Sequence, residues 1–165
     1  AQALRDADPA VRRSAAQALG AYADALEPLL AALTDEAAPV RIAAVESLCQ
    51  LGDRRAWPAL VAALGDPDWG VRLYAVSALA ELGGEAALEP LIEALNDPHD
   101  TVKRLAAQML GELGDLRAVL PLVDALADWP PALRWAPREA LVAIAGGKDF
   151  GEDLQGWTIW WAEQQ

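Results

Sequence analysis

The stretch VRLYAVSALAELGG, residues 71–84, occurs in five related copies along the chain. The other copies begin at Val11, Val40, Val102 and Leu133, and the last four copies start 31 residues apart. A fixed period of this length is typical of repeat proteins, in which a single unit is too small to bury its own apolar face and stacks on its neighbours. The sequence therefore predicts a row of similar units.

Each unit contains two helical patterns. In the second pattern, which holds the quoted phrase, Val71, Ala75 and Leu79 recur with the spacing of one helix face. The first pattern carries a proline in its first turn, where the missing N–H costs little. This first helix is expected at residues 25–33, 56–64, 87–95 and 118–126. Left-handed C-caps of the second helices are expected at Gly52, Gly83 and Gly114.

The motif ALxDxxxxVRxxAxxxL appears as ALTDEAAPVRIAAVESL, ALGDPDWGVRLYAVSAL and ALNDPHDTVKRLAAQML. It resembles the HEAT repeat, in the short form found in PBS-lyase HEAT-like proteins, and the resemblance covers residues 3–145. The resemblance implies an all-α fold: a right-handed α-α superhelix, or HEAT-like solenoid, of about five two-helix repeats. It also implies that the second helices line the concave surface. We interpret residues 1–165 as a single domain.

The two ends depart from the period. The chain starts inside a unit, so the first repeat is expected to be truncated, and further residues or a neighbouring unit are expected to cover it. Residues 146–165 are expected to form a C-terminal cap, with Asp153 as the N-cap of its helix. Trp157, Trp160 and Trp161 share one face of that helix and are predicted to pack on the core.

Composition excludes several classes of partner. The net charge of −12 opposes binding to a phosphate backbone, so no nucleic acid is expected. No apolar run reaches the roughly 20 residues of a membrane span, so no membrane contact is expected either. One cysteine and one histidine exclude an internal disulfide and a histidine-based metal cluster. We predict a cytoplasmic protein without metal or cofactor.

An acidic residue precedes a basic one by six positions in every copy. The pairs are Asp6/Arg12, Asp35/Arg41, Asp66/Arg72, Asp97/Lys103 and Asp128/Arg134. A catalytic carboxylate does not need five copies, so we interpret the pattern as a ladder of ion pairs and caps that ties loops to helices.

Two further residues invite a chemical role. Cys49 falls in a column of mostly small residues and is expected to be a buried, inert thiol; a lyase thiol that holds a chromophore is the alternative. His99 lies in the loop between two helices and is expected to be exposed to solvent. Trp57 aligns with buried aliphatic residues of the other copies and is expected in the core.

Helical geometry places one stripe of the second helices opposite the buried face. Large apolar side chains occupy this stripe where a solvated helix would carry Lys or Glu, most densely in the third copy. An exposed apolar patch with a polar rim is typical of an interaction site. The residues predicted to bind a partner are Ile42, Trp69, Leu73, Tyr74, Arg104, Leu105, Gln108 and Trp135. The alternative is that these side chains pack against neighbouring repeats.

We therefore interpret the chain as a non-catalytic scaffold whose concave surface binds a protein or peptide. It is predicted not to be an enzyme, because the sequence holds no nucleophile–base pair, phosphate loop or metal motif. The alternative, which the family resemblance implies, is a bilin-lyase-like enzyme subunit or chromophore chaperone. A third interpretation is a fragment of a larger solenoid whose function lies elsewhere. The partner's identity and the oligomeric state stay open.

Overall fold

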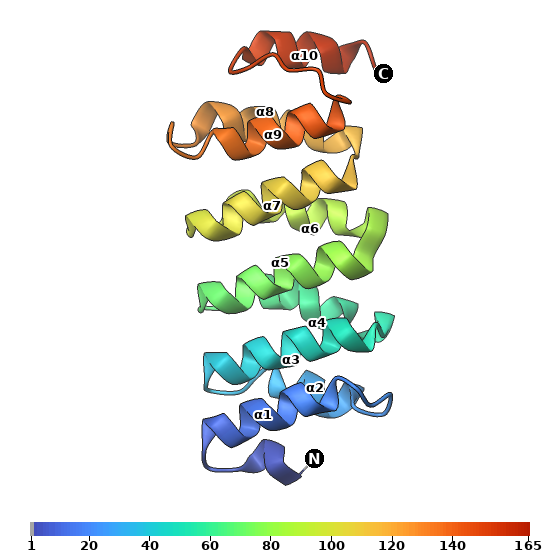
Figure 1. Cartoon of the computed structure of the whole chain (residues 1–165), viewed down its shortest axis with the longest axis vertical. Coiled ribbons are helices and arrows are strands. Elements are labelled where there is room, and N and C mark those ends of the chain that lie inside the picture. Colours follow the sequence, from blue (N-terminus) through green and yellow to red (C-terminus); the bar gives the residue numbers. More distant parts are fainter. Residues whose placement is uncertain (1) are drawn as a thin grey trace. The chain divides into compact units, whose positions relative to one another are not determined.

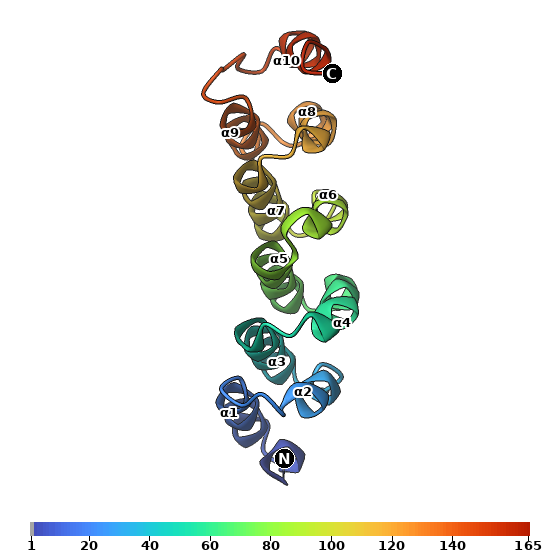
Figure 2. The same cartoon turned by 90° about the vertical axis from the view of Figure 1, so that its right-hand side faces the viewer.

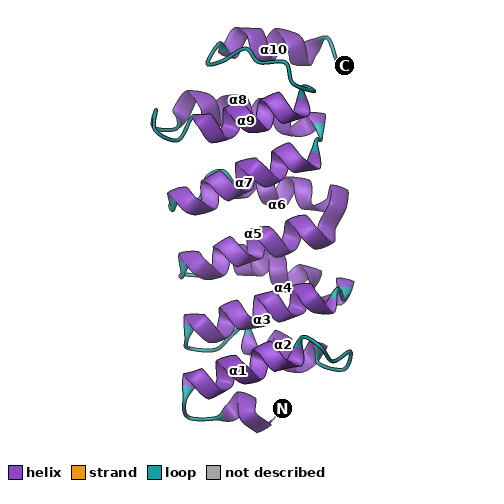
Figure 3. Ribbon diagram, viewed as in Figure 1, coloured by secondary structure: helices purple, strands orange, loops and turns teal. Residues whose placement is uncertain are grey.

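The computed structural model describes residues 2–165, which form helices and their connections without any strand (Figures 1 and 3). The helices gather into two compact units, a first unit that ends at Gly83 and a second unit that begins at Gly84. Each unit is built from antiparallel helix pairs in two layers, so the predicted all-α class and α-α superhelix are confirmed. The single domain stays a prediction.

In the first unit, α1, α3 and α5 form one layer, and α2 and α4 form the other (Figure 2). Their bounds are α1 Pro9–Leu19, α2 Leu26–Ala32, α3 Ala38–Leu51, α4 Trp57–Ala62 and α5 Trp69–Gly83. Short 3-10 turns occupy Gln2–Arg5, Arg54–Ala56 and Ala63–Gly65. Leu29, Leu48, Leu60 and Leu79 are fully buried between the layers, as the apolar spacing predicts.

In the second unit, α7 and α9 form one layer, and α6 and α8 form the other (Figure 2). The helices are α6 Leu88–Ala94, α7 Asp100–Leu113, α8 Val119–Asp128, α9 Trp135–Ile144 and α10 Leu154–Ala162, with 3-10 turns at Gly84–Ala87 and Leu116–Ala118. The last helix, α10, packs on α8. The carboxylate of Asp153 accepts two backbone N–H groups at its start, as predicted for the N-cap.

The tryptophans follow the predictions only in part. Trp157 and Trp160 of α10 are buried, as expected. Trp161 is half-buried and its indole N–H donates to the carbonyl of Leu116 at 3.1 Å. Trp57, expected in the core, is only half-buried: it is the first residue of α4 and packs against the core from its border.

Glycines end the second helices at two of the three expected positions. Gly52 and Gly114 have φ values of 65° and 71°, the left-handed conformation that lacks a steric penalty only without a Cβ. The third prediction is wrong by one residue: α5 continues through Gly83, and Gly84 takes the positive φ. The reason is that a 3-10 turn follows α5 without an intervening loop.

In the first two copies, the acidic and basic residues six positions apart do not form an ion pair with each other. Instead, Arg12 donates from Nη1 to the backbone carbonyl of Asp6, and Arg41 likewise to that of Asp35, both at 2.8 Å. The remaining guanidinium nitrogens bind the carboxylate of the next repeat. Arg12 Nε and Nη2 lie 2.7 and 2.9 Å from the two oxygens of Asp35, and Arg41 lies 2.7 Å from both oxygens of Asp66. The predicted ladder therefore exists, but its ion pairs join consecutive repeats.

These bidentate pairs, which we call clamps, are largely hidden from water. The side chains of Arg41 and Asp66 are 11% and 10% exposed. The hydrogen bond from Arg12 lowers the pKa of Asp35. Burial acts to raise the pKa of Asp66, but the hydrogen bonds from Arg41 and from a backbone N–H outweigh it and leave that pKa lowered. Both carboxylates are therefore ionised at neutral pH, and the clamps persist.

The clamp changes in the second unit. The donor position is Lys103, whose ammonium lies over the indole ring of Trp129, 5.7 Å from the ring centroid. Arg134 donates to the backbone carbonyl of Trp129 at 2.9 Å and pairs with Glu152 at 3.1 Å. The predicted pairing of Asp128 with Arg134 is therefore wrong, because the Arg134 guanidinium binds the backbone carbonyl of Trp129 and the carboxylate of Glu152 instead.

Replacement of one clamp arginine is expected to destabilise the fold. Arg41→Gln leaves the Asp66 carboxylate buried without its guanidinium, which costs about 1–3 kcal/mol in the free energy of unfolding. Urea unfolding followed by circular dichroism measures this loss. The matched control is Arg55→Gln, which removes a 2.6 Å pair with Asp53 whose arginine is 73% exposed. A much smaller change is expected there, because water replaces the lost partner. Equal effects of both variants would contradict the role of the clamp.

Candidate functional site

The structure separates the eight predicted partner-binding residues into two groups. Ile42, Trp69, Leu73 and Tyr74 belong to α3 and α5 of the first unit, and Arg104, Leu105, Gln108 and Trp135 to α7 and α9 of the second.

Two bulky aromatic side chains of the first unit are exposed, as the stripe predicts. Trp69 is 44% exposed and Tyr74 is 39% exposed. Leu73 and Ile42 are half-buried. The tip of Ile42 lies close to Gly70, where a Cβ would approach it to 3.2 Å, so Ile42 packs against the start of α5. The alternative of packing between repeats thus describes Ile42 and Leu73 in part, whereas it does not describe the two aromatic residues.

A groove of about 350 Å³ lies beside Tyr74, between α3 and α5. We call it the α3–α5 groove; it is lined by Glu46, Cys49, Gln50, Tyr74, Ser77, Ala78 and Glu81. One aromatic ring and two carboxylates therefore meet at a surface depression. Of the lining residues, the sequence predicts Tyr74 as a binding residue, but it does not predict a role for Cys49 here. The available signal was that Cys49 follows Glu46 by three positions, which places both on one helix face.

The thiol of Cys49 forms part of this groove and is not fully buried, contrary to the prediction. It is half-buried and donates to Oε2 of Glu81 at 3.0 Å. Burial raises the pKa of Cys49 to about 12, with further contributions from the hydrogen bond to Glu81 and from its negative charge. Because the thiolate is the nucleophile, the neutral thiol has little reactivity at physiological pH.

The second group of residues lies on α7 and at the start of α9. Trp135 is 49% exposed, and Gln108 is exposed and donates to Oε1 of Glu112 at 2.9 Å. Leu105 and Arg104 are half-buried. The Nε of Arg104 is buried and has no hydrogen-bond acceptor. A buried donor without an acceptor is unfavourable, which singles out this arginine within the group.

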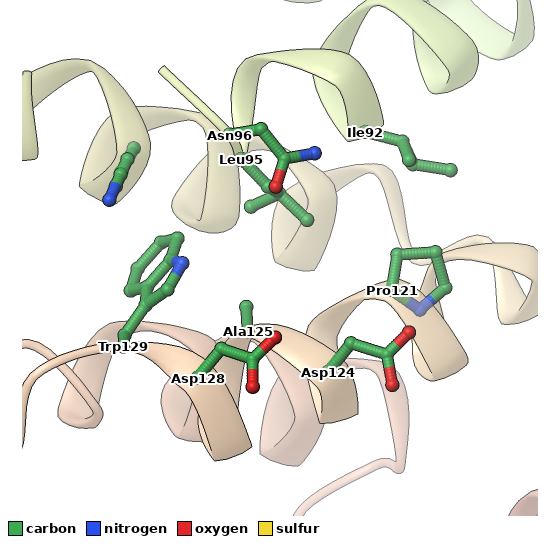
Figure 4. Close-up of a pocket in the computed structure, with 9 residues that line it drawn as sticks. Ile92, Leu95, Asn96, Pro121, Asp124, Ala125, Asp128 and Trp129 are labelled. Carbon is green, nitrogen blue, oxygen red and sulfur yellow. The ribbon is translucent and has the colours of Figure 1, made fainter. Parts of the chain in front are cut away.

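A second cavity, of about 530 Å³, opens between α6 and α8 of the second unit (Figure 4). We call it the α6–α8 pocket; it is lined by Ile92, Leu95, Asn96, Lys103, Pro121, Asp124, Ala125, Asp128 and Trp129. Sequence reasoning missed this pocket, because it considered only the exposed stripe of the second helices. The available signals were the lysine at position 103, where the first three copies have arginine, and the tryptophan directly after Asp128.

His99, the remaining candidate residue, forms a hydrogen bond at the start of α7. His99 was expected to be exposed, but it is half-buried, and its Nδ1 accepts the backbone N–H of Thr101 at 3.3 Å at the start of α7. The loop histidine therefore caps a helix. Within residues 2–165, no group of three or more His, Cys, Asp or Glu side chains is arranged to hold a metal ion. No helix in the same part of the chain is long and apolar enough to cross a membrane.

With this geometry established, comparison with known proteins identifies the family. The model of HEAT repeats matches residues 1–72, 26–109 and 57–142, and the chain belongs to the HEAT-repeat family. No curated protein sequence matches it.

Solved structures extend the comparison. One similar structure is the complex of CpcE and CpcF of phycocyanin lyase from Nostoc sp. PCC7120, with a TM-score of 0.68 and 28% identity. The match covers 88% of this chain and 63% of the lyase chain, so this chain spans less than two thirds of that subunit. An engineered protein matches with a TM-score of 0.58 and 21% identity, over 87% of this chain and 77% of the other, which shows the fold alone.

The prediction that the protein is not an enzyme is contradicted by the likeness to a lyase complex. The prediction depended on the absence of short catalytic motifs. A repeat protein that holds a substrate against a second protein uses side chains from several repeats, and such a site leaves no compact motif in the sequence.

The hydrogen bond between Cys49 and Glu81 predicts a specific change in thiol reactivity. Glu81→Gln removes the negative charge that helps to keep the thiol protonated, so the pKa of Cys49 falls and the thiolate fraction rises. Each pKa unit of decrease gives about tenfold more thiolate near pH 8, so alkylation by iodoacetamide is expected to accelerate roughly tenfold. Mass spectrometry follows the reaction at the single cysteine.

The control is Glu46→Gln, which alters the same groove without removing a hydrogen bond to the thiol. A smaller acceleration is expected. An unchanged rate in Glu81→Gln would show that Glu81 does not hold the thiol proton.

Proposed function

We propose that this chain is a HEAT-repeat module of a bilin lyase, and that its α3–α5 groove holds the bilin chromophore without a covalent bond. The likeness to the phycocyanin lyase complex over 88% of the chain supports this class of function. The observation that carries the proposal is the groove itself, where the exposed Tyr74 lies beside the carboxylates Glu46 and Glu81.

The chemistry of a bilin suits this groove. A bilin is a linear tetrapyrrole, a conjugated system with pyrrole N–H donors along one edge. An aromatic side chain offers a stacking surface to such a system, and carboxylates accept hydrogen bonds from its N–H groups. Tyr74 supplies the ring, and Glu46 and Glu81 supply the acceptors. The thiol of Cys49 donates to Oε2 of Glu81, so Oε1 of the same carboxylate remains for a ligand.

The protonated thiol of Cys49 favours reversible, non-covalent binding of the bilin in the groove. A thiolate adds to electrophilic double bonds, whereas a thiol with a pKa of about 12 does so slowly. In this proposal the groove presents the chromophore to a cysteine of the recipient protein and does not retain it.

We also propose that the group on α7 and α9 contacts a protein, either a second subunit or the recipient. Tryptophan and arginine are frequent hot spots of protein interfaces, and Trp135 is half-exposed on this face. Gln108, exposed on the same face, and Trp135 offer polar and aromatic contacts to such a partner. The solved lyase is itself a complex of two proteins, CpcE and CpcF.

The groove predicts that loss of Tyr74 weakens binding of a bilin. Phycocyanobilin titrated into the purified chain is expected to show a saturable red shift in absorbance. Tyr74→Ala removes the stacking surface and is expected to raise the dissociation constant about fivefold, given the worth of an aromatic contact. Glu46→Gln combined with Glu81→Gln is expected to weaken binding further, because the charged acceptors are lost.

Tyr22 offers a matched control, since it is also an exposed tyrosine of the first unit, at 59%, but lies outside the groove. Tyr22→Ala is expected to bind phycocyanobilin as the unaltered chain does. The proposal fails if no saturable binding occurs, or if both tyrosine variants lose affinity equally.

A further inference from the structure

The α6–α8 pocket stands where the arginine clamp of the first unit is interrupted in the second. Arg12 and Arg41 each bind the aspartate of the following repeat through two hydrogen bonds. The corresponding acceptor in the second unit is Asp128, and the corresponding donor position is Lys103. Lys103 does not reach this carboxylate as an arginine would, because its ammonium lies over Trp129.

The carboxylate of Asp128 is consequently available in the pocket. Asp128 is exposed, and within residues 2–165 its carboxylate forms no ion pair. Figure 4 shows Asp124 and Asp128 on the same side of the pocket, with their carboxylates near the open space below Asn96 and beside Pro121. Ile92, Leu95 and Pro121 add an apolar wall to this space.

We propose that the α6–α8 pocket binds an arginine side chain of a partner protein. The guanidinium would bind Asp128 as Arg12 binds Asp35, through two hydrogen bonds, and Asp124 would lie close enough to add its charge. The methylene groups of the arginine would lie along the apolar wall. This site lies in the second unit and does not depend on the proposed bilin function.

Three observations favour arginine over other occupants. Arg12 and Arg41 of the first unit each bind the equivalent aspartate through the guanidinium, so the repeat geometry suits the planar fork of arginine. The two carboxylates outnumber the single ammonium in the pocket. The net charge of −12 attracts basic partners at long range. A pocket of about 530 Å³ has ample room for one arginine side chain.

Nuclear magnetic resonance tests the proposal with N-acetyl-L-arginine amide as the probe. Saturable shifts are expected for the indole N–H of Trp129 and the side-chain amide of Asn96. The neutral analogue N-acetyl-L-citrulline amide has nearly the same shape and is expected to bind at least tenfold more weakly. Asp128→Asn is expected to weaken arginine binding at least tenfold, and its amide spectrum shows whether the exposed substitution leaves the fold intact.

Lys103→Arg is the decisive variant, because it places an arginine of the chain itself at the donor position of the clamp. Its guanidinium is expected to occupy Asp128 and to abolish binding of the probe. Lys103→Gln, the matched control, offers no guanidinium and is expected to keep the binding. The proposal is overturned if the unaltered chain shows no saturable shift, if citrulline binds as well as arginine, or if Lys103→Arg binds the probe like Lys103→Gln.

Discussion

Stacking of each helix pair on the next is the physical constraint on which the remaining structure depends. The apolar stripe of each helix packs on the opposite layer and on the neighbouring repeat, and residues such as Leu48 and Leu79 are fully buried there. The helices approach very closely in places: a Cβ added to Gly111 would come within 2.8 Å of the Cα of Ala140. Small residues at positions 111 and 140 are therefore required for the close packing between α7 and α9.

Apolar contact alone does not fix how far one repeat slides or turns on the next, whereas a bidentate ion pair does. The clamps of Arg12 and Arg41 each join a helix start, the backbone of its own loop and the loop of the next repeat. One guanidinium therefore satisfies two loops at once, in a directional geometry that a lysine cannot reproduce. At position 103, where lysine replaces arginine, the ammonium lies over the ring of Trp129 and both residues line a pocket.

The sequence was sufficient to predict the fold class, the two helices of each repeat and the exposure of Trp69 and Tyr74, because these follow from period and helix geometry. It was not sufficient to identify the partners of the clamp. Arg12 and Asp35 are 23 residues apart, and only the stacking of repeats brings them together. The groove around Cys49 was missed for the same reason, since Glu81 reaches it from the adjacent helix. The prediction that the chain is not an enzyme relied on the absence of local motifs, whereas the finding that contradicts it is a likeness to a lyase complex over 88% of the chain.

The carboxylate beside Cys49 has a further consequence for the chain in an oxidising environment. Hydrogen peroxide and disulfides react with the ionised form of a cysteine, which Glu81 and partial burial suppress. The single sulfhydryl group of the chain, although partly open to solvent, is therefore expected to form sulfenic acid and disulfides between molecules slowly.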